Sequence, residues 1–229
     1  MTSGEIPEGL KAVENVVFGM RRPGLLEIKF HSPKRNNPIN MEQLELITNL
    51  VNEAQEDAKV KVILLHGGKY FTSGLDVSVF APNNGMTPEQ AMAYYQNGSE
   101  VVMPNFIMAI ASSIKPVIMV VRGGCIGIGM TMLTHASFVF TSPEAKMVAP
   151  FVQTFQTPEG TSTLQFPRVF GAKVANEILL TGRPVSAEDA VLAGFSNGVI
   201  DSFDPSSEWF EPESIPVLKK LLRADGVTL

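Results

Sequence analysis

One stretch, Lys115 to Leu133 (KPVIMVVRGGCIGIGMTML), most constrains how this chain can fold. Its first part, Val117 to Val121, is apolar and mostly β-branched, which is typical of a strand buried on both faces. Glycines follow at 123, 124, 127 and 129, and a helix-forming pattern resumes at Met130. Backbone N–H groups near Ile128 would then lie unpaired at a helix start, where they attract negative charge. The stretch therefore predicts an anion or oxyanion site made of main chain.

The familiar glycine-loop motifs do not fit this stretch. A dinucleotide fingerprint counted from Gly127 would need a third glycine where Met132 stands, and the Gly-Lys-Ser/Thr of a phosphate-binding loop is absent. A phosphate cradle is therefore not expected. The alternative that the glycines only let a helix pack closely on a sheet stays open at this point.

Composition excludes several classes of function. The 229 residues carry a net charge of -5 without a basic block, so neither nucleic acid nor an anionic membrane surface is an expected partner. The apolar runs are interrupted before the roughly 18 to 20 residues that a membrane span needs, which predicts a soluble protein. The single cysteine, Cys125, excludes an intramolecular disulfide, and the three histidines show no metal-ligand spacing. No metal site is expected.

The order of predicted elements is α/β, with helices layered on a largely parallel sheet. An amphipathic helix is predicted from Met41 to about Asp57, and a long helical pattern from Thr87 to about Ile114 with a break at Pro104. Thr157-Pro158-Glu159 resembles the start of another helix, with a cap, a first-turn proline and an acid. The remaining predicted strands are 16–20, 25–30, 60–65, 138–141 and 147–148, and the remaining helices are 172–180, 186–193 and 215–223.

These elements predict three segments. The first twelve residues, with Gly4, Pro7 and Gly9, are expected to form a flexible arm without regular structure, and residues 13–203 a core domain. Residues 204–229 are expected to form a short C-terminal segment.

Several motifs, in order, resemble those of the crotonase (enoyl-CoA hydratase/isomerase) superfamily. They are NNPIN, VKVILLHGGKYFTSGLDV, IKPVIMVVRGGCIGIGM and the run from PEAKMVAPF to FSNGVI, and together they cover roughly residues 16 to 200. The resemblance implies the crotonase fold of repeated β-β-α units. It also implies an oxyanion hole for an acyl-CoA thioester, formed by the backbone N–H groups of Leu75 and Ile128, with Ser73, Gly74 and Gly127 beside the substrate.

Within that family, the carboxylates distinguish the reactions. The positions that hold the two glutamates of hydratases are Thr131 and Phe151 here. Glu159, which precedes a glycine, resembles the single catalytic glutamate of peroxisomal-type Δ3,Δ2-enoyl-CoA isomerases. One carboxylate is sufficient to move a proton from C2 to C4. The alternative is that Glu159 only complements a helix dipole.

The resemblance and the residues together suggest further binding groups. Met130, Phe151 and Phe155 could form the apolar wall of an acyl pocket or belong to the core. Asp76 is expected to be a helix cap. Lys34 and Arg35 could pair with the phosphates of CoA, or the loop could simply be solvated.

Two departures from the family bear on its function. The segment His135-Ala136-Ser137 lacks the usual acid, so local support there must differ. The family continues with several C-terminal helices, of which little is present, so another subunit supplies them or the chain is incomplete. Alternatives to the isomerase are therefore an inactive interaction subunit, a thioester hydrolase or a hydratase.

The remaining implications concern context. The family typically forms homotrimers or dimers of trimers and needs no cofactor. The isomerases resembled imply a peroxisome, but the chain ends in Val227-Thr228-Leu229 rather than Ser-Lys-Leu, so the mitochondrial matrix or the cytoplasm is possible.

Overall fold

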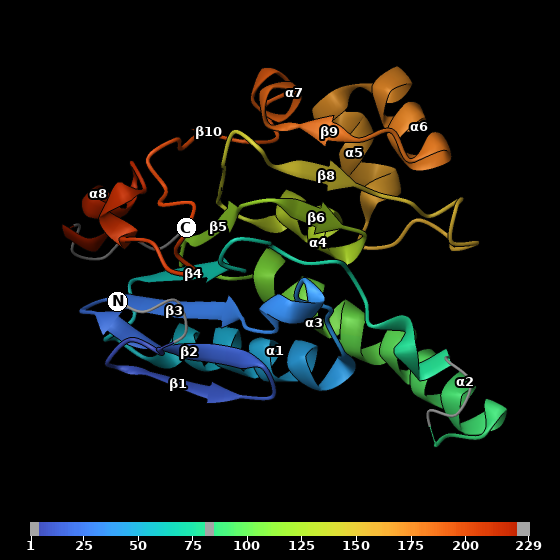
Figure 1. The fold of residues 1–229 in the computed structure, drawn as a ribbon, viewed down its shortest axis with the longest axis horizontal. Helices are drawn as coiled ribbons and strands as arrows, with labels where there is room; N and C mark the ends of the chain where they lie inside the picture. Colours follow the sequence, from blue (N-terminus) through green and yellow to red (C-terminus); the bar gives the residue numbers. More distant parts are fainter. Residues whose placement is uncertain (1–4, 81–84, 224–229) are drawn as a thin grey trace.

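The computed structural model describes residues 5–80 and 85–223. A seven-stranded sheet forms the centre, in the order β1-β2-β3-β4-β5-β7-β10, and a three-stranded sheet has the order β6-β8-β9 (Figure 1). The strands of the large sheet are β1 (Leu10–Val13), β2 (Val16–Arg22), β3 (Leu25–Phe30), β4 (Val62–His66), β5 (Val117–Val121), β7 (Phe138–Thr141) and β10 (Gly198–Val199). Those of the small sheet are β6 (Gly124–Ile126), β8 (Lys146–Val148) and β9 (Val185–Ser186). From β3 onward the large sheet is parallel, so the predicted α/β class is confirmed.

The helices lie between and around these strands. They are α1 (Met41–Glu56), α2 (Pro88–Asn97), α3 (Met103–Ala111), α4 (Ile128–Thr131), α5 (Ser162–Phe170), α6 (Ala172–Thr181), α7 (Ala187–Leu192) and α8 (Leu218–Arg223). Shorter helical turns are η1 (Pro33–Arg35), η2 (Val77–Phe80), η3 (Gly98–Val102), η4 (Met132–His135) and η5 (Pro212–Ser214). Helix α2 projects away from the body as an arm (Figure 1).

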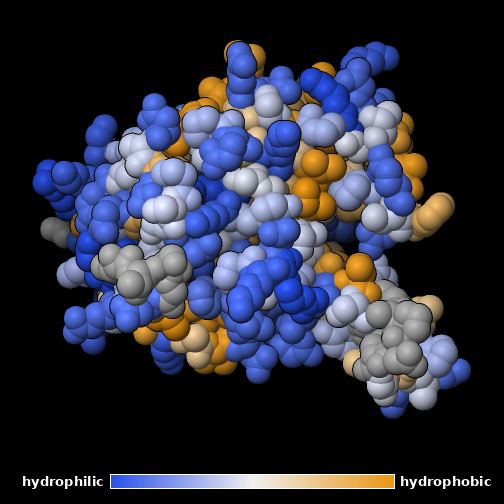
Figure 2. Space-filling model, in the orientation of Figure 1, coloured by the Kyte–Doolittle hydropathy of each residue, from blue (hydrophilic) through white to orange (hydrophobic). Residues whose placement is uncertain are grey.

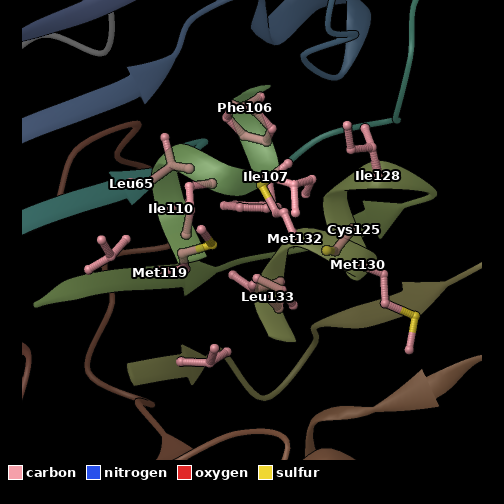
Figure 3. Packing of buried hydrophobic residues seen from close by; sticks show 14 of the residues in the cluster. Leu65, Phe106, Ile107, Ile110, Met119, Cys125, Ile128, Met130, Met132 and Leu133 are labelled. Atoms are coloured by element: carbon pink, nitrogen blue, oxygen red, sulfur yellow. The ribbon is translucent and has the colours of Figure 1, made fainter. Parts of the chain in front are cut away.

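Alternation along the strands gives the large sheet two buried faces. In β3, Leu26, Ile28 and Phe30 pack with α1 and α3, whereas Leu25 packs with the C-terminal residues Phe210 and Ile215 on the other face. Figure 3 shows the first of these cores, where side chains of α3, α4 and β5 meet. Burial on both faces explains the continuous apolar run of Val117–Val121.

Three boundaries differ from those predicted. Leu10–Val13 pairs with β2, so the first twelve residues are not wholly free of regular structure: the open edge of β2 accepts a strand there. The break predicted at Pro104 lies slightly earlier, because α3 starts at Met103 and Pro104 occupies its first turn, where its missing N–H is tolerated. The irregularity is instead the π-helix η3 just before it.

The third difference matters for the site. The helix predicted from Thr157-Pro158-Glu159 begins only at Ser162, so Glu159 lies in a loop. In α2, by contrast, Thr87 is the N-cap, Pro88 lies in the first turn, and Thr87 and Gln90 form a capping box. The same three-residue pattern therefore gives a helix start in one place and a loop in the other.

A buried polar cluster holds the C-terminal segment on the sheet. Arg21 donates to both oxygens of Glu27 at 2.8 and 3.1 Å and to the carbonyl oxygen of Phe210 at 2.8 Å. Glu27 also lies 3.0 Å from Nε2 of His66. Lys29, whose side chain is wholly buried, lies 3.7 Å from the carboxylate of Glu208. Pairing of this kind is what allows charged groups inside a sheet-covered core.

Two classes of feature are missing from the part of the chain that the structure describes. None of the helices in residues 5–80 and 85–223 is both long and apolar enough to cross a membrane. Over the same ranges, no three His, Cys, Asp or Glu side chains gather in a way that could hold a metal ion.

Because Lys29 is buried in this cluster, the free energy of unfolding should change with pH in the alkaline range. Burial lowers the pKa of Lys29 to about 8, against the opposing attraction of Glu208 and Glu27. Between pH 8 and the ordinary value of 10.5 the unfolded chain holds a proton that the folded chain has lost, so stability rises with pH. The free energy of unfolding of the wild type, minus that of Lys29→Met, should therefore increase by about 3 kcal/mol over this window.

Denaturant unfolding at a series of pH values measures this difference. Exposed Lys59→Met is the matched control and should track the wild type. Parallel pH curves for wild type and Lys29→Met would show that Lys29 keeps its ordinary ionisation when folded.

Candidate functional site

A cavity of about 440 Å³ lies between the α2 arm and the body. This volume is within the range of about 300 to 1,000 Å³ that is typical of small-molecule sites. The cavity is lined by Ser73, Gly74, Leu75, Val77, Tyr95, Ser99, Met103, Ile126, Gly127, Ile128, Pro150, Phe151, Thr154, Gln156, Thr157, Pro158 and Glu159. Figure 2 shows a notch at this side of the molecule, where the arm leaves the body and apolar residues gather.

Two loops that are far apart in sequence meet at one edge of the cavity. The N–H of Ile126 donates to the carbonyl oxygen of Thr72 at 3.0 Å. Thr72 and Cys125 also form an isolated parallel β-bridge. Gly74 has a φ of +89°, and a Cβ placed there would lie 3.0 Å from the carbonyl oxygen of Ile126. Glycine is therefore required where the two backbones approach each other.

Each loop presents a free backbone N–H at the cavity. Ile39 exchanges its backbone hydrogen bonds with Gly74 and Asp76, so the N–H of Leu75 between them points away from Ile39. Ile128 is the first residue of α4, where a helix N–H has no partner within the helix. Within the described part of the chain, neither N–H has a hydrogen-bond acceptor, and both residues line the cavity. The structure thus places at one cavity the N–H groups of Leu75 and Ile128, the pair that the resemblance implied for an oxyanion hole.

Glu159 also lines the cavity. Its Oε1 accepts a hydrogen bond from the Thr131 hydroxyl at 2.9 Å, and its carbonyl oxygen accepts one from the Ser162 hydroxyl at 2.7 Å. Its Oε2 is buried and has no hydrogen-bond partner among the described residues. Burial raises the pKa of Glu159 to about 7, although the hydrogen bond from Thr131 lowers it in part. A carboxyl group with that pKa can both accept and return a proton near neutral pH.

The loop that carries Glu159 is held in an uncommon backbone conformation. Gly160 and Thr161 both have a φ of +61°, which is rare for a threonine. His135 Nε2 lies 3.1 Å from the carbonyl oxygen of Gly160 and 3.1 Å from the hydroxyl of Thr161. His135, in the segment His135-Ala136-Ser137, therefore supports the backbone of this loop.

Not all the predicted binding residues line this cavity. Ser73, Gly74, Gly127 and Phe151 do. Met130 is wholly buried in the same hydrophobic core as Cys125 and Met132 (Figure 3) and does not line the cavity, which favours the core interpretation over the acyl wall. Phe155 is also not a wall residue, because it is 98% exposed on the outside of the loop that carries Phe151.

The charged residues near the glycine loop form a surface pair. Arg35 donates to both oxygens of Asp76 at 3.2 and 3.0 Å. Asp76 also accepts a hydrogen bond from the N–H of Ser78, as expected of a residue that caps the following turn, η2. Lys34 is exposed. None of the three lines the cavity.

Several cavity residues were missed by the sequence reasoning. Tyr95, Ser99 and Met103 come from α2, η3 and α3 respectively, and the hydroxyl oxygen of Tyr95 lies 3.3 Å from Nε2 of Gln156. No local motif marks residues that meet only because elements far apart in sequence come together in the fold. The π-helix η3 has no sequence pattern of its own. Such helices are rare, but they are frequently found at functional sites.

The raised pKa of Glu159 gives a testable effect on stability. Because the folded pKa lies above the ordinary value of 4.5, ionisation of Glu159 costs stability as pH rises from 4.5 through 7. Glu159→Gln cannot ionise, so it should be more stable than the wild type by about 3 kcal/mol at pH 8. At pH 4 the two proteins should differ little. Urea unfolding at the two pH values measures this, and an equal difference at both would contradict the buried carboxylate described here.

The comparisons with known proteins agree with this geometry. The family model for enoyl-CoA hydratase/isomerase matches residues 21–227. Human enoyl-CoA delta isomerase 2 is 28% identical over 209 residues, which are 87% of this chain and 52% of that protein. Human chromodomain Y-like protein is 29% identical over 194 residues, which are 85% of this chain and 31% of that protein. The chain thus spans about half the length of the first of these relatives and less of the second.

Solved structures show the same fold. The enoyl-CoA hydratase/isomerase from Pseudoalteromonas atlantica T6c superposes with a TM-score of 0.75 at 24% identity, covering 93% of this chain and 78% of that one. The family match extends over most of the chain, and the fold and the paired glycine loops agree with it. This chain belongs to the enoyl-CoA hydratase/isomerase family and has the crotonase fold.

Proposed function

We propose that this chain binds a fatty 3-enoyl-CoA and shifts its double bond to the 2 position, with Glu159 as the single base and no cofactor. The observation that carries the proposal is the buried, unpartnered Oε2 of Glu159 in a cavity with two free backbone N–H groups. An oxygen in that state costs stability, which is expected where a group must act on a ligand.

The reaction follows from these three groups. The thioester oxygen accepts hydrogen bonds from the N–H groups of Leu75 and Ile128, which stabilise negative charge developing there. Oε2 of Glu159 removes a proton from C2, and the electrons of that C–H bond form a dienolate. The same carboxyl returns the proton to C4, so the C3–C4 double bond becomes a C2–C3 double bond. No water is consumed.

Hydration is less well supported by the residues present. Among the described residues that line the cavity, Glu159 is the one carboxylate. Phe151, at one of the two positions where hydratases have a glutamate, contributes an apolar wall instead. A second acid to orient a water molecule is therefore not available in this wall.

Two parts of the proposal concern groups outside the cavity. Lys34 and Arg35 lie on the exposed turn η1 and are proposed to contact the CoA phosphates. A homotrimer, or a dimer of such trimers, is proposed as the assembly. Leu180 on α6 is 61% exposed and Leu192 on α7 is 80% exposed, which supports burial of this side against another copy.

Removing the base tests the proposal directly. Glu159→Gln keeps the size and hydrogen bonding of the side chain but cannot take a proton, so turnover of 3-enoyl-CoA should fall by about 100- to 10,000-fold. The dissociation constant for acyl-CoA should change little. Exposed Glu144→Gln is the matched control and should retain wild-type turnover.

Other results would point to other functions. A wild-type protein that binds acyl-CoA but never moves a 3-double bond would be an interaction subunit, and release of free CoA would indicate a thioester hydrolase. An active isomerase that is indifferent to Glu159→Gln would contradict the single-base mechanism.

The oxyanion donors can be tested by removing one N–H. Ile128→Pro deletes the N–H at the first position of α4, where proline is tolerated. Loss of one such donor costs on the order of 100- to 1,000-fold in turnover. Ile128→Val keeps the N–H and should lose little. If a folded Ile128→Pro variant, checked by near-UV circular dichroism, turned over normally, Ile128 would not be a donor.

A further inference from the structure

Thr131 occupies a position that the proposed reaction does not use directly. It is the last residue of α4 and is wholly buried. Its hydroxyl donates to Oε1 of Glu159 at 2.9 Å, and a second acceptor, the carbonyl oxygen of Ile128, lies further away at 3.3 Å. A hydroxyl has one proton, and a bond to a carboxylate is the stronger of the two.

The loop that carries Glu159 closes over the same hydroxyl. A Cβ placed on Gly160 would lie 2.5 Å from Oγ1 of Thr131, so only glycine lets the loop backbone come this near. Thr131 is thus in contact with both the side chain of Glu159 and the backbone that follows it. This double contact restricts the orientation of the Glu159 carboxyl group.

The contact makes the two oxygens of Glu159 different. A free carboxyl group could turn and present either oxygen, but here Oε1 is occupied by Thr131 and Oε2 has no partner among the described residues. Oε2 is therefore the oxygen left for a ligand. Ile128 and Thr131 also begin and end the same short helix, three residues apart, which places them on one side of it.

We propose that Thr131 is a positioning residue, whose hydroxyl fixes the carboxyl of Glu159 relative to the backbone donor of Ile128 so that Oε2 alone carries the proton. The role of Thr131 in catalysis rests on the proposed isomerase function. The contact itself can be tested without substrate, because a donated hydrogen bond stabilises the carboxylate and lowers its pKa.

The test compares Thr131→Val, which keeps the shape and loses the hydroxyl, with Thr131→Ser, which keeps the hydroxyl. Thr48→Val is the matched control: Thr48 is also buried on a helix, donates to a backbone carbonyl at 2.7 Å, and lies outside the cavity. Turnover and KM are measured with 3-enoyl-CoA across pH. The carboxyl carbon of Glu159 is also titrated by 13C NMR in the free protein, with Glu159→Gln to assign the signal.

Thr131→Val should lower kcat roughly tenfold on the alkaline plateau, where Glu159 is ionised in every variant, and change KM by less than about twofold. It should also move the acid limb of the pH profile, and the NMR titration of Glu159, to higher pH by roughly one unit. Thr131→Ser should restore both properties, and Thr48→Val should alter neither.

An unshifted Glu159 titration in Thr131→Val would overturn the proposal, whatever the activity. So would a Thr131→Ser protein as impaired as Thr131→Val, since packing rather than the hydroxyl would then matter. If the titration shifts as expected but the wild type does not isomerise 3-enoyl-CoA, the contact stands and the proposed function fails.

Discussion

The hydrogen bond between Ile126 and Thr72 is the contact on which the site depends. It joins two loops that come from different units of the fold, one after β4 and one after β5. Both donors of the proposed oxyanion hole lie within three residues of this contact. Their separation is therefore set by main-chain geometry rather than by side chains, which suits a hole that must already be formed when charge develops on the ligand.

The same contact explains the glycines around it. Gly74 leaves no room for a side chain against Ile126, and Gly127 has a φ of +56° and ψ of -121°, a backbone region that is essentially restricted to glycine. The glycines were open to two interpretations in the sequence, close packing or an anion site. In the structure the two interpretations are compatible, because the two loops pack closely and the residues with free N–H groups, Leu75 and Ile128, line one cavity.

The parts that could be predicted from sequence are those with a local cause. The buried strand Val117–Val121, helix α1 and the hairpin of β2 and β3 follow from apolar period and turn chemistry. The backbone N–H of Ile128 could be located from a strand, a glycine loop and a helix start, whereas that of Leu75 came only from the family resemblance. The start of α5 could not, because Thr157-Pro158-Glu159 has every local sign of a helix start and is overridden by contacts from residues far away in sequence, Thr131 and His135.

The later start of α5 also changes the role that Glu159 can have. In a first helical turn it would be an ordinary dipole-complementing acid, but in the observed loop it has no such role. The positive φ of Thr161 and the buried, unpartnered Oε2 each cost free energy. The loop withstands these costs because separate contacts fix it: His135 holds its backbone, Ser162 its carbonyl oxygen and Thr131 its carboxyl. A surface acid would need none of these contacts. The free-energy cost of the strained loop and of the unpartnered oxygen is therefore an argument that Glu159 acts on a ligand.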